Sequence, residues 1–241
     1  ARGKKPLLEN IEIKKIAAEG KSIAYVDEKV LFVPNTVPGD IVDVQVTRKR
    51  KSFLEGFIVN VRKYSDIRTE PFCSHFGVCG GCKWQNLPYQ LQTEFKQQEI
   101  VDNLQRIGKV ELQNVSPIIG SPKTTYYRNK LEYTFCNKRF LTREEIANGQ
   151  DIDRTPAVGF HVPGLFDKVI DIKKCYLQAE PSNAVRNFIR DYAIEHELSF
   201  YDIRKQAGFL RTLIVRTSST GEVMVIVTFG EENLEAREGL L

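Results

Sequence analysis

The pattern of apolar and polar positions predicts a strand-rich first part of the chain. Between residues 11 and 61, short apolar segments are separated by turn residues such as Gly20 and Gly39. Apolar and polar side chains alternate over 41–46 and read similarly over 56–61, which indicates half-buried strands. Roughly five short strands in about 50 residues predict a small β-barrel that is closed or nearly closed.

Two helices are predicted in the rest of the chain. The first spans 86–108, and its apolar side chains recur at helical spacing, so we expect them to pack in a core. These side chains are Leu91, Phe95, Val101, Leu104 and Ile107. The second begins at Ser182, which we expect to act as its N-cap, and continues to about Glu197. Its predicted apolar face consists of Ala184, Val185, Phe188, Ile189 and Tyr192.

The strands predicted between and after these helices indicate a second, α+β domain with a mainly antiparallel sheet. They are 126–135, 157–161, 168–172 and a hairpin of 210–217 with 222–229. The polar stretch 141–156 is predicted to form a mobile excursion between strands. Residues 231–241 begin another helical pattern that stops abruptly, which favours a piece of a longer protein.

Composition narrows these expectations. A chain of 241 residues with 41% hydrophobic residues can form two modest domains, which we place at 1–63 and 64–230, followed by 231–241 as the start of a linker. The sequence has no run of eighteen apolar residues and no apolar core of a signal peptide near its start. We therefore expect a cytoplasmic protein with no membrane partner.

The positive charge is concentrated at the front of the chain. Residues 1–63 contain 13 Lys and Arg against 8 Asp and Glu, whereas residues 64–241 contain 22 against 23. Four successive cations and then an aromatic residue follow the strand at 41–46: Arg48, Lys49, Arg50, Lys51 and Phe53. On a hairpin tip they could grip phosphates and stack one base. On charge alone, a solvated basic face explains the excess equally well.

The cysteines carry the most specific chemical signal. Cys73, Cys79 and Cys82 lie on one glycine-containing loop, and Cys175 lies far downstream. Three clustered thiolates with a distant fourth are typical of an iron-sulfur site, whereas structural zinc usually takes two short-spaced pairs. Zinc remains the rival. Cys136 lies in an apolar run and reads as a half-buried strand thiol, and His75 reads as a bystander within the loop.

Together these features resemble the bacterial RNA uracil-5-methyltransferases, specifically the 23S rRNA (RumA-type) branch, over nearly the whole chain. Val37–Val42, followed by the basic stretch and Gly56, looks like a TRAM domain, an OB-like RNA-binding barrel. The cysteine loop is similar to that family's [4Fe-4S] loop. Further similar strings are Tyr127–Lys130, Val158–His161, Asp171–Cys175 and Leu210–Arg216.

The resemblance implies that Cys73, Cys79, Cys82 and Cys175 hold an architectural [4Fe-4S] cluster. It further implies that the partner is RNA, in particular 23S rRNA, and not DNA, with S-adenosylmethionine as the methyl donor and 5-methyluridine as the product. Arg128 and Lys130 are expected to join the RNA-binding surface.

Family enzymes bind S-adenosylmethionine on a C-terminal Rossmann-like domain that also carries the catalytic cysteine. No strand leading into a glycine-rich turn is found in this sequence, and Cys136 lies in the wrong region for that nucleophile. We therefore predict that the chain has no catalytic or donor-binding residues, lacks the Rossmann-like methyltransferase domain and is inactive alone. The helix at 86–108 would then pack on that absent domain.

Two other protein classes are weighed against this one. The chain could be a complete, non-enzymatic RNA-binding protein stabilised by zinc, and metal content discriminates this alternative. A radical S-adenosylmethionine enzyme is disfavoured, because its loop has three residues between the first two cysteines, where Cys73 and Cys79 are separated by five.

Overall fold

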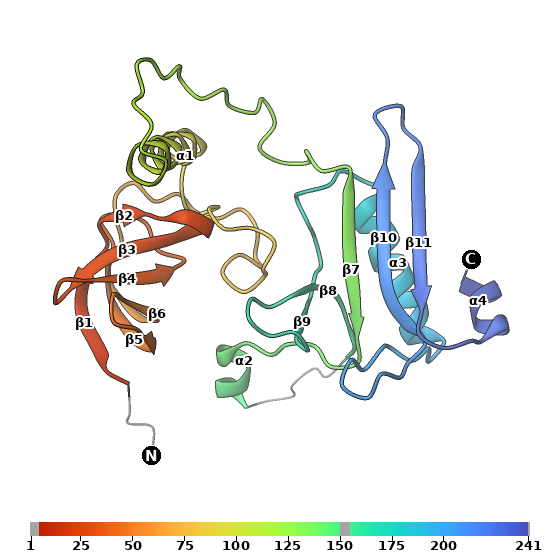
Figure 1. Cartoon of the computed structure of the whole chain (residues 1–241). Coiled ribbons are helices and arrows are strands. Elements are labelled where there is room, and N and C mark those ends of the chain that lie inside the picture. Colours follow the sequence, from red (N-terminus) through yellow and green to blue (C-terminus); the bar gives the residue numbers. More distant parts are fainter. Residues whose placement is uncertain (1–4, 150–154, 241) are drawn as a thin grey trace. The chain divides into compact units, whose positions relative to one another are not determined.

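The computed structural model describes residues 5–149 and 155–240, which form two compact units (Figure 1). Unit 1 comprises residues 1–72 and 82–122, and unit 2 comprises residues 73–81 and 123–241. The boundary expected at residue 63 coincides with the end of a strand. However, residues 82–122, which follow the cysteine loop, group with unit 1.

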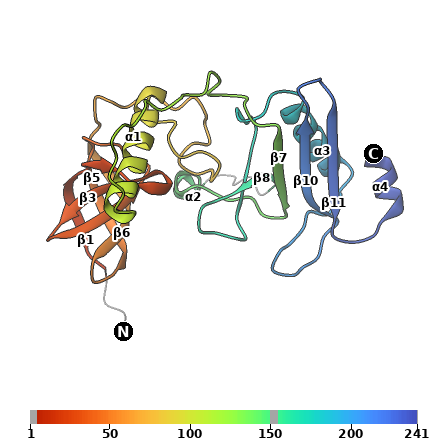
Figure 2. The ribbon, with the colours of Figure 1, turned by 45° about the horizontal axis from the view of Figure 1, so that its top comes forward.

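Unit 1 is built on one curled six-stranded sheet in the order β1-β5-β6-β4-β3-β2 (Figures 1 and 2). Its elements are β1 (Leu7–Glu12), β2 (Lys15–Ile16), the turn η1 (Ala18–Gly20), β3 (Lys21–Val26), β4 (Lys29–Pro34), β5 (Ile41–Lys49) and β6 (Phe53–Lys63). All neighbouring strands are antiparallel except β4 and β6, which are parallel. In the described part of the chain no ladder joins β1 to β2, so strand pairing leaves the sheet open.

The alternation at 41–46 produces the core of unit 1. Val42, Val44 and Val46 are buried, and they pack with apolar residues from the other strands. Those partners are Ile13, Ala24, Leu31, Val33 and Leu54. Asp43 is buried as well, which a simple alternation of apolar and polar residues does not predict.

The first predicted helix forms, but its apolar stripe is not buried in a core of the described residues. It consists of α1 (Tyr89–Asp102) and a π-helical turn, η2 (Asn103–Ile107), and it ends at Gly108. No residue of α1 is buried, and Ile107 is 79% exposed. Polar side chains anchor the helix instead, because Gln92 Nε2 donates to the Trp84 carbonyl at 2.9 Å and Gln97 Nε2 to the Ser116 carbonyl at 3.1 Å. The apolar spacing correctly indicated a helix, but it did not indicate whether other residues would cover the apolar side chains.

Unit 2 contains a five-stranded sheet in the order β11-β10-β7-β8-β9, and every neighbouring pair is antiparallel. Its elements are β7 (Lys130–Cys136), α2 (Arg143–Asn148), β8 (Ala157–His161), β9 (Val169–Asp171), α3 (Ser182–Glu195), β10 (Leu210–Thr217), β11 (Val223–Phe229) and α4 (Leu234–Leu240). Helix α3 lies against one face of the sheet (Figures 1 and 2). The predicted α+β arrangement with an antiparallel sheet is present in unit 2.

Two predicted segments of unit 2 differ in detail from the structure. β7 begins at Lys130 rather than at 126, because Tyr126 takes a positive φ of 53° that an extended strand excludes. The polar stretch 141–156 contains α2, which begins with a reciprocal capping box between Thr142 and Glu145. Residues 150–154 of that stretch lie outside the described residues.

Helix α3 begins at Ser182 and buries Ile189, as predicted, but the N-cap role of Ser182 and the burial of Phe188 are wrong. Ser182 is buried inside the first turn, and its Oγ donates to Gln178 Oε1 at 2.7 Å rather than capping the helix. Phe188, assigned to the apolar face, is 62% exposed. The residues buried in the first half of α3 are instead polar, Asn183 and Arg186.

Candidate nucleic-acid interface and cysteine site

The basic cluster sits at the tip of the β5–β6 hairpin in unit 1. The Arg50 amide donates to the Phe53 carbonyl at 2.8 Å and closes the turn. Lys49, Arg50 and Lys51 are exposed, and none forms an ion pair with another described residue. The hairpin therefore presents three cations that can meet phosphate oxygens without first giving up a carboxylate.

Arg48 and Phe53 are less available than their neighbours. Arg48 Nη1 lies 3.4 Å from Glu55 Oε2, and its guanidinium carbon lies 5.9 Å from the centre of the Phe53 ring. Phe53 is half-buried and packs edge-on against Phe32, with ring centres 5.9 Å apart. A base could stack only on the part of the Phe53 ring that these contacts leave open.

Two buried carboxylates stabilise unit 1. Asp40, which is fully buried, accepts from Arg68 Nη2 at 2.7 Å and from the Val37 amide at 2.8 Å. Asp43 accepts from Arg62 Nε at 2.7 Å. The backbone amide of Asn10 lowers the pKa of Asp43 most, and the side chains of Asn60 and Arg62 lower it further. Both anions are thus compensated within unit 1.

Arg128 and Lys130 are both exposed in unit 2, and the structure adds Arg216. Lys130 in β7 lies opposite Arg216 in β10 in an antiparallel pair, so the two side chains share the face of the sheet that Lys130 exposes. The Arg128 amide donates to the Leu177 carbonyl at 2.8 Å, which fixes the approach to β7. The alternation of β10 could have indicated Arg216 as a surface cation, but its pairing with Lys130 depends on the sheet register.

Within unit 2 the cysteine loop lies against the segment that leads to Cys175. The Lys173 amide donates to His75 Nε2 at 3.1 Å. The Gly81 amide donates to Cys79 Sγ at 3.3 Å. At Gly80, a Cβ atom would lie 2.9 Å from the His161 carbonyl oxygen, so the close approach of loop and strand requires glycine there.

The structure does not test the four predicted ligands as a set, because they are divided between the two units. Cys73, Cys79 and Cys175 belong to unit 2, and Cys82 belongs to unit 1. Across residues 5–149 and 155–240, no group of three or more His, Cys, Asp or Glu side chains is arranged to hold a metal ion. The assignment of Cys73, Cys79, Cys82 and Cys175 as ligands therefore stays a prediction.

One buried group nevertheless fits an anionic cluster at these cysteines. Cys175 is buried, and its amide donates to Asn183 Oδ1 at 2.7 Å. The same oxygen accepts from Arg186 Nη1 at 2.9 Å. Arg186 is fully buried, and its Nε atom has no hydrogen-bond partner. A guanidinium that shares an acceptor with the amide of a predicted thiolate ligand, and has a nitrogen without a partner, is compatible with the donor set.

His75 and Cys136 behave as structural residues. Because His75 Nε2 accepts a hydrogen bond from an amide, its ring is neutral; burial lowers the pKa of His75 and the charge of Arg186 lowers it further. Cys136 Sγ donates to the Lys138 carbonyl at 3.2 Å, and burial raises the pKa of this thiol. A protonated core thiol is a poor nucleophile.

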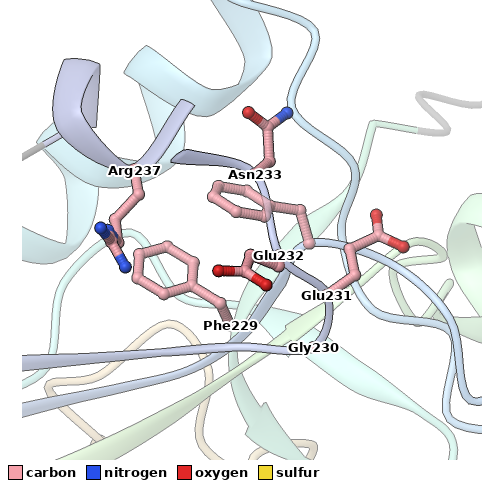
Figure 3. Close-up of a pocket in the computed structure, with 7 residues that line it drawn as sticks. Phe229, Gly230, Glu231, Glu232, Asn233 and Arg237 are labelled. Carbon is pink, nitrogen blue, oxygen red and sulfur yellow. The ribbon is translucent and has the colours of Figure 1, made fainter. Parts of the chain in front are cut away.

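A pocket of about 330 Å³ lies where β11 leads into α4 (Figure 3). It is lined by Phe209, Phe229, Gly230, Glu231, Glu232, Asn233 and Arg237. The Phe209 and Phe229 rings stack 4.6 Å apart, and Asn233 Oδ1 accepts from the Ala236 amide at the start of α4. None of the predicted site residues lines this pocket.

Among the helices of residues 5–149 and 155–240, none combines the length with the apolar character that a membrane span requires.

Comparisons with known proteins find a TRAM domain match and relatives named RNA methyltransferase. The TRAM domain family matches residues 9–59. A protein of Bacteroides thetaiotaomicron named "Uncharacterized RNA methyltransferase" is 57% identical over 212 residues, which cover 88% of this chain and 47% of that protein. A protein of the same name from Porphyromonas gingivalis is 49% identical over 237 residues, which cover 96% of this chain and 51% of that protein.

A solved structure shares the fold. The Pyrococcus abyssi tRNA (uracil-54, C5)-methyltransferase in complex with S-adenosyl-L-homocysteine matches with a TM-score of 0.65 and 24% identity. The match covers 97% of this chain and 49% of that one.

These matches overturn the prediction of an inactive piece that lacks the methyltransferase domain and its donor-binding part; that prediction is wrong. As much as 97% of this chain aligns with 49% of the solved methyltransferase chain, and most of it aligns with proteins named RNA methyltransferase. The prediction relied on a missing glycine-rich turn and on the abrupt pattern at 231–241, and neither feature reports where a methyltransferase holds its donor or substrate.

The chain spans about half the length of the curated relatives it matches, so the activity of the whole protein is a matter for proposal. Residues 9–59 match the TRAM domain family, and over most of its own length the chain is similar to proteins named RNA methyltransferase.

Proposed function

We propose that the protein takes part in transferring the methyl group of S-adenosylmethionine to C5 of a uracil in RNA, forming 5-methyluridine. The observation that carries this proposal is the fold match over 97% of the chain to a tRNA (uracil-54, C5)-methyltransferase in complex with S-adenosyl-L-homocysteine, the demethylated form of the donor. The names of the relatives support the reaction class. They disfavour the alternative of a non-enzymatic, zinc-stabilised RNA-binding protein.

In this proposal the TRAM domain binds the RNA backbone. The exposed cations Lys49, Arg50 and Lys51 at the hairpin tip contact phosphates, because each can neutralise one phosphate and release its counterions. Arg48 contributes less, since Glu55 already lies beside it. In unit 2, Arg128, Lys130 and Arg216 offer a second basic area for the same RNA. The protein would act in the cytoplasm, and we expect no DNA partner.

We further propose that Cys73, Cys79, Cys82 and Cys175 hold a [4Fe-4S] cluster. When bound, such a cluster would supply a rigid cross-link between the loop and the segment before α3, without requiring a redox step. Closing a loop of about a hundred residues otherwise has a substantial entropic cost. The glycines at 80 and 81 and the bond from the Gly81 amide to Cys79 Sγ support a thiolate site in this loop.

The RNA substrate has two candidates. The motif resemblance favours 23S rRNA, whereas the solved structure that shares the fold is that of a tRNA methyltransferase. Both would present a uracil in a structured RNA, so the protein's own contacts do not separate them. Methylation of purified rRNA and tRNA fractions, followed by mapping of 5-methyluridine, assigns the substrate.

The reaction is tested with the complete gene product and RNA that carries tritium at C5 of uridine. Bond formation between the methyl carbon and C5 displaces the C5 proton, so tritium release to water must accompany 5-methyluridine. Release should require S-adenosylmethionine and should stop when S-adenosyl-L-homocysteine replaces it. If neither rRNA nor tRNA loses tritium with active, cluster-containing protein, the uracil-C5 assignment is wrong.

RNA binding by the hairpin is tested separately. The triple substitution of Lys49, Arg50 and Lys51 by Ala should reduce the slope of log affinity against log salt concentration by roughly 2 to 3 units. The matched control replaces three exposed lysines elsewhere, Lys109, Lys138 and Lys205, with the same loss of charge. Equal slopes for the hairpin variant and the wild type would remove the hairpin from the interface.

A further inference from the structure

We propose that Arg186 is the buried countercharge of the cysteine site and keeps a metal–thiolate centre bound through its positive charge. The inference rests on the proposed cluster, and it assigns a positioning role to a residue of α3 that the cysteine pattern alone does not reveal. Arg186 ranks first by volume among the fully buried side chains of the described residues. A fully buried arginine is rare unless an anion compensates its charge.

No carboxylate provides that compensation among the described residues. Arg186 forms no ion pair with any of them, whereas Arg190, one turn later on α3, pairs with Asp171 at 2.8 Å and with Asp191 at 2.7 Å. Helix α3 therefore carries two arginines in opposite situations. Arg190 is neutralised by the protein itself, and Arg186 is not.

The hydrogen-bond partners of Arg186 are all neutral. Nη2 donates to the Lys173 carbonyl at 2.6 Å and to Asn187 Oδ1 at 3.0 Å, and Nη1 donates to Asn183 Oδ1 at 2.9 Å. The ring of Tyr133 lies 5.1 Å from the guanidinium carbon. These groups orient the guanidinium but do not cancel its charge, and Nε is left without a partner. Burying a cation among neutral partners is costly, and an anion nearby would offset that cost.

Both arms of the cysteine site in unit 2 meet at this guanidinium. Lys173, whose carbonyl accepts from Arg186, donates its amide to His75 in the loop between Cys73 and Cys79. Asn183, which accepts from Arg186, accepts through the same oxygen from the Cys175 amide. Through hydrogen bonds, Lys173 therefore links Arg186 to the loop, and Asn183 links Arg186 to Cys175.

A positive charge in this position has a defined effect on thiolate chemistry. It attracts a negatively charged metal–thiolate centre, and hence favours the metal-bound over the metal-free state. Four thiolates around an iron-sulfur core carry a net negative charge, which becomes more negative on reduction. Removal of the cation should therefore weaken cluster retention and shift the reduction potential to a more negative value.

The experiment compares the complete, anaerobically prepared protein with three variants: Arg186→Met, Arg186→Lys and Arg190→Met. Iron, acid-labile sulfide and zinc are measured per chain, followed by the rate of loss of visible absorption in a chelator and the midpoint potential. Arg186→Met should lose its cluster about 10 to 100 times faster than the wild type. Arg186→Lys, which keeps the charge, should stay close to the wild type. The matched Arg190→Met removes a cation that the protein already neutralises, so it should also stay close.

The outcomes separate the two proposals. A folded Arg186→Met variant that keeps its cluster as long as the wild type does, with the same midpoint potential, would refute the countercharge role of Arg186. The cluster proposal itself would stand. If Arg186→Met does not fold, Arg186→Lys decides, since loss of its cluster would show that shape rather than charge matters. Zinc in the wild type, lost faster in Arg186→Met, would refute the iron-sulfur assignment and support the countercharge. Neither iron nor zinc in the wild type would overturn both.

Discussion

The two units bury charge in opposite ways. Unit 1 buries two carboxylates, Asp40 and Asp43, and pairs each with an arginine of its own. Unit 2 buries the guanidinium of Arg186 and offers it only neutral acceptors among the described residues. The difference teaches that the buried carboxylates of unit 1 are compensated within that unit, whereas the buried guanidinium of unit 2 is left for the anionic ligand proposed above.

This contrast follows from what each unit has to hold. Asp40 accepts from the amides of Val37 and Ser65 as well as from Arg68, so a single carboxylate fastens the turn before β5 to the segment after β6. Arg186 fastens the segment before Cys175 in a similar manner, but through carbonyl and amide oxygens. The Asp40 network pairs its charge within unit 1. The Arg186 network leaves its charge for the ligand proposed above.

The largest expected effect is the loss of the Asp40 network in unit 1. Asp40→Ala leaves Arg68 and two amides without their acceptor, and removal of one partner from a buried pair costs about 3 to 5 kcal/mol of unfolding free energy. Urea unfolding measures this loss, which should be the same with and without metal. Asp66→Ala, an exposed carboxylate in the same unit, is the control and should change stability by less than about 0.5 kcal/mol. A metal-dependent loss for Asp40→Ala would erase the distinction between the units.

The second effect concerns the ligands of unit 2. Cys175→Ser should abolish cluster binding, because the buried hydroxyl cannot replace a thiolate ligand, and it should lower the unfolding temperature of unit 2. Iron analysis and calorimetry measure the two consequences. Cys136→Ser is the matched change at a buried cysteine outside the predicted ligand set, and it should keep the iron. Full iron occupancy in Cys175→Ser would contradict the ligand assignment.

A smaller effect tests whether the charge of Arg186 matters only when a ligand is present. A 10- to 100-fold loss of metal affinity corresponds to about 1.4 to 2.7 kcal/mol. Arg186→Met should therefore lose that much more unfolding free energy in the metal-loaded protein than in the chelator-treated one. An equal loss in both states would make Arg186 an ordinary structural residue, comparable to Asp40.

Much of the fold could be predicted from local pattern. The limits of β8 and β10 match the sequence prediction, and β11 starts one residue later than predicted, because Ser-Ser-Thr-Gly marks the turn and strict alternation marks the strands. The end of the first helix at Gly108 was equally readable. These features depend on neighbouring residues only.

What could not be predicted depends on residues far apart in the sequence. The periodicity of α3 favours Phe188 as core, yet the helix turns Asn183 and Arg186 inward because Tyr133, Lys173 and Cys175 need polar partners there. No helical periodicity signals such a face. The stripe of α1 failed for the complementary reason, since nothing in the sequence says whether unit 1 supplies a surface to cover it.

The smallest expected effect is a pH dependence in unit 1. Hydrogen bonds from the Asn10 amide, Asn60 and Arg62 hold the pKa of Asp43 below its ordinary value of 3.8. The folded state therefore binds the proton more weakly than the unfolded state, and the stabilisation is present above that value and is lost as the pH falls through the lower folded pKa. Asp43→Asn should be less stable than the wild type at about pH 7, and the difference should shrink below about pH 3.9.

Urea unfolding at a series of pH values measures this convergence, and Asp66→Asn provides an exposed carboxylate for comparison. If the gap between wild type and Asp43→Asn stays constant down to acid pH, the stabilisation comes from the shape of the hydrogen-bond network rather than from its charge. Unit 1 would then resemble the neutral cradle around Arg186 more than a set of matched ions, and charge compensation would no longer separate the two units.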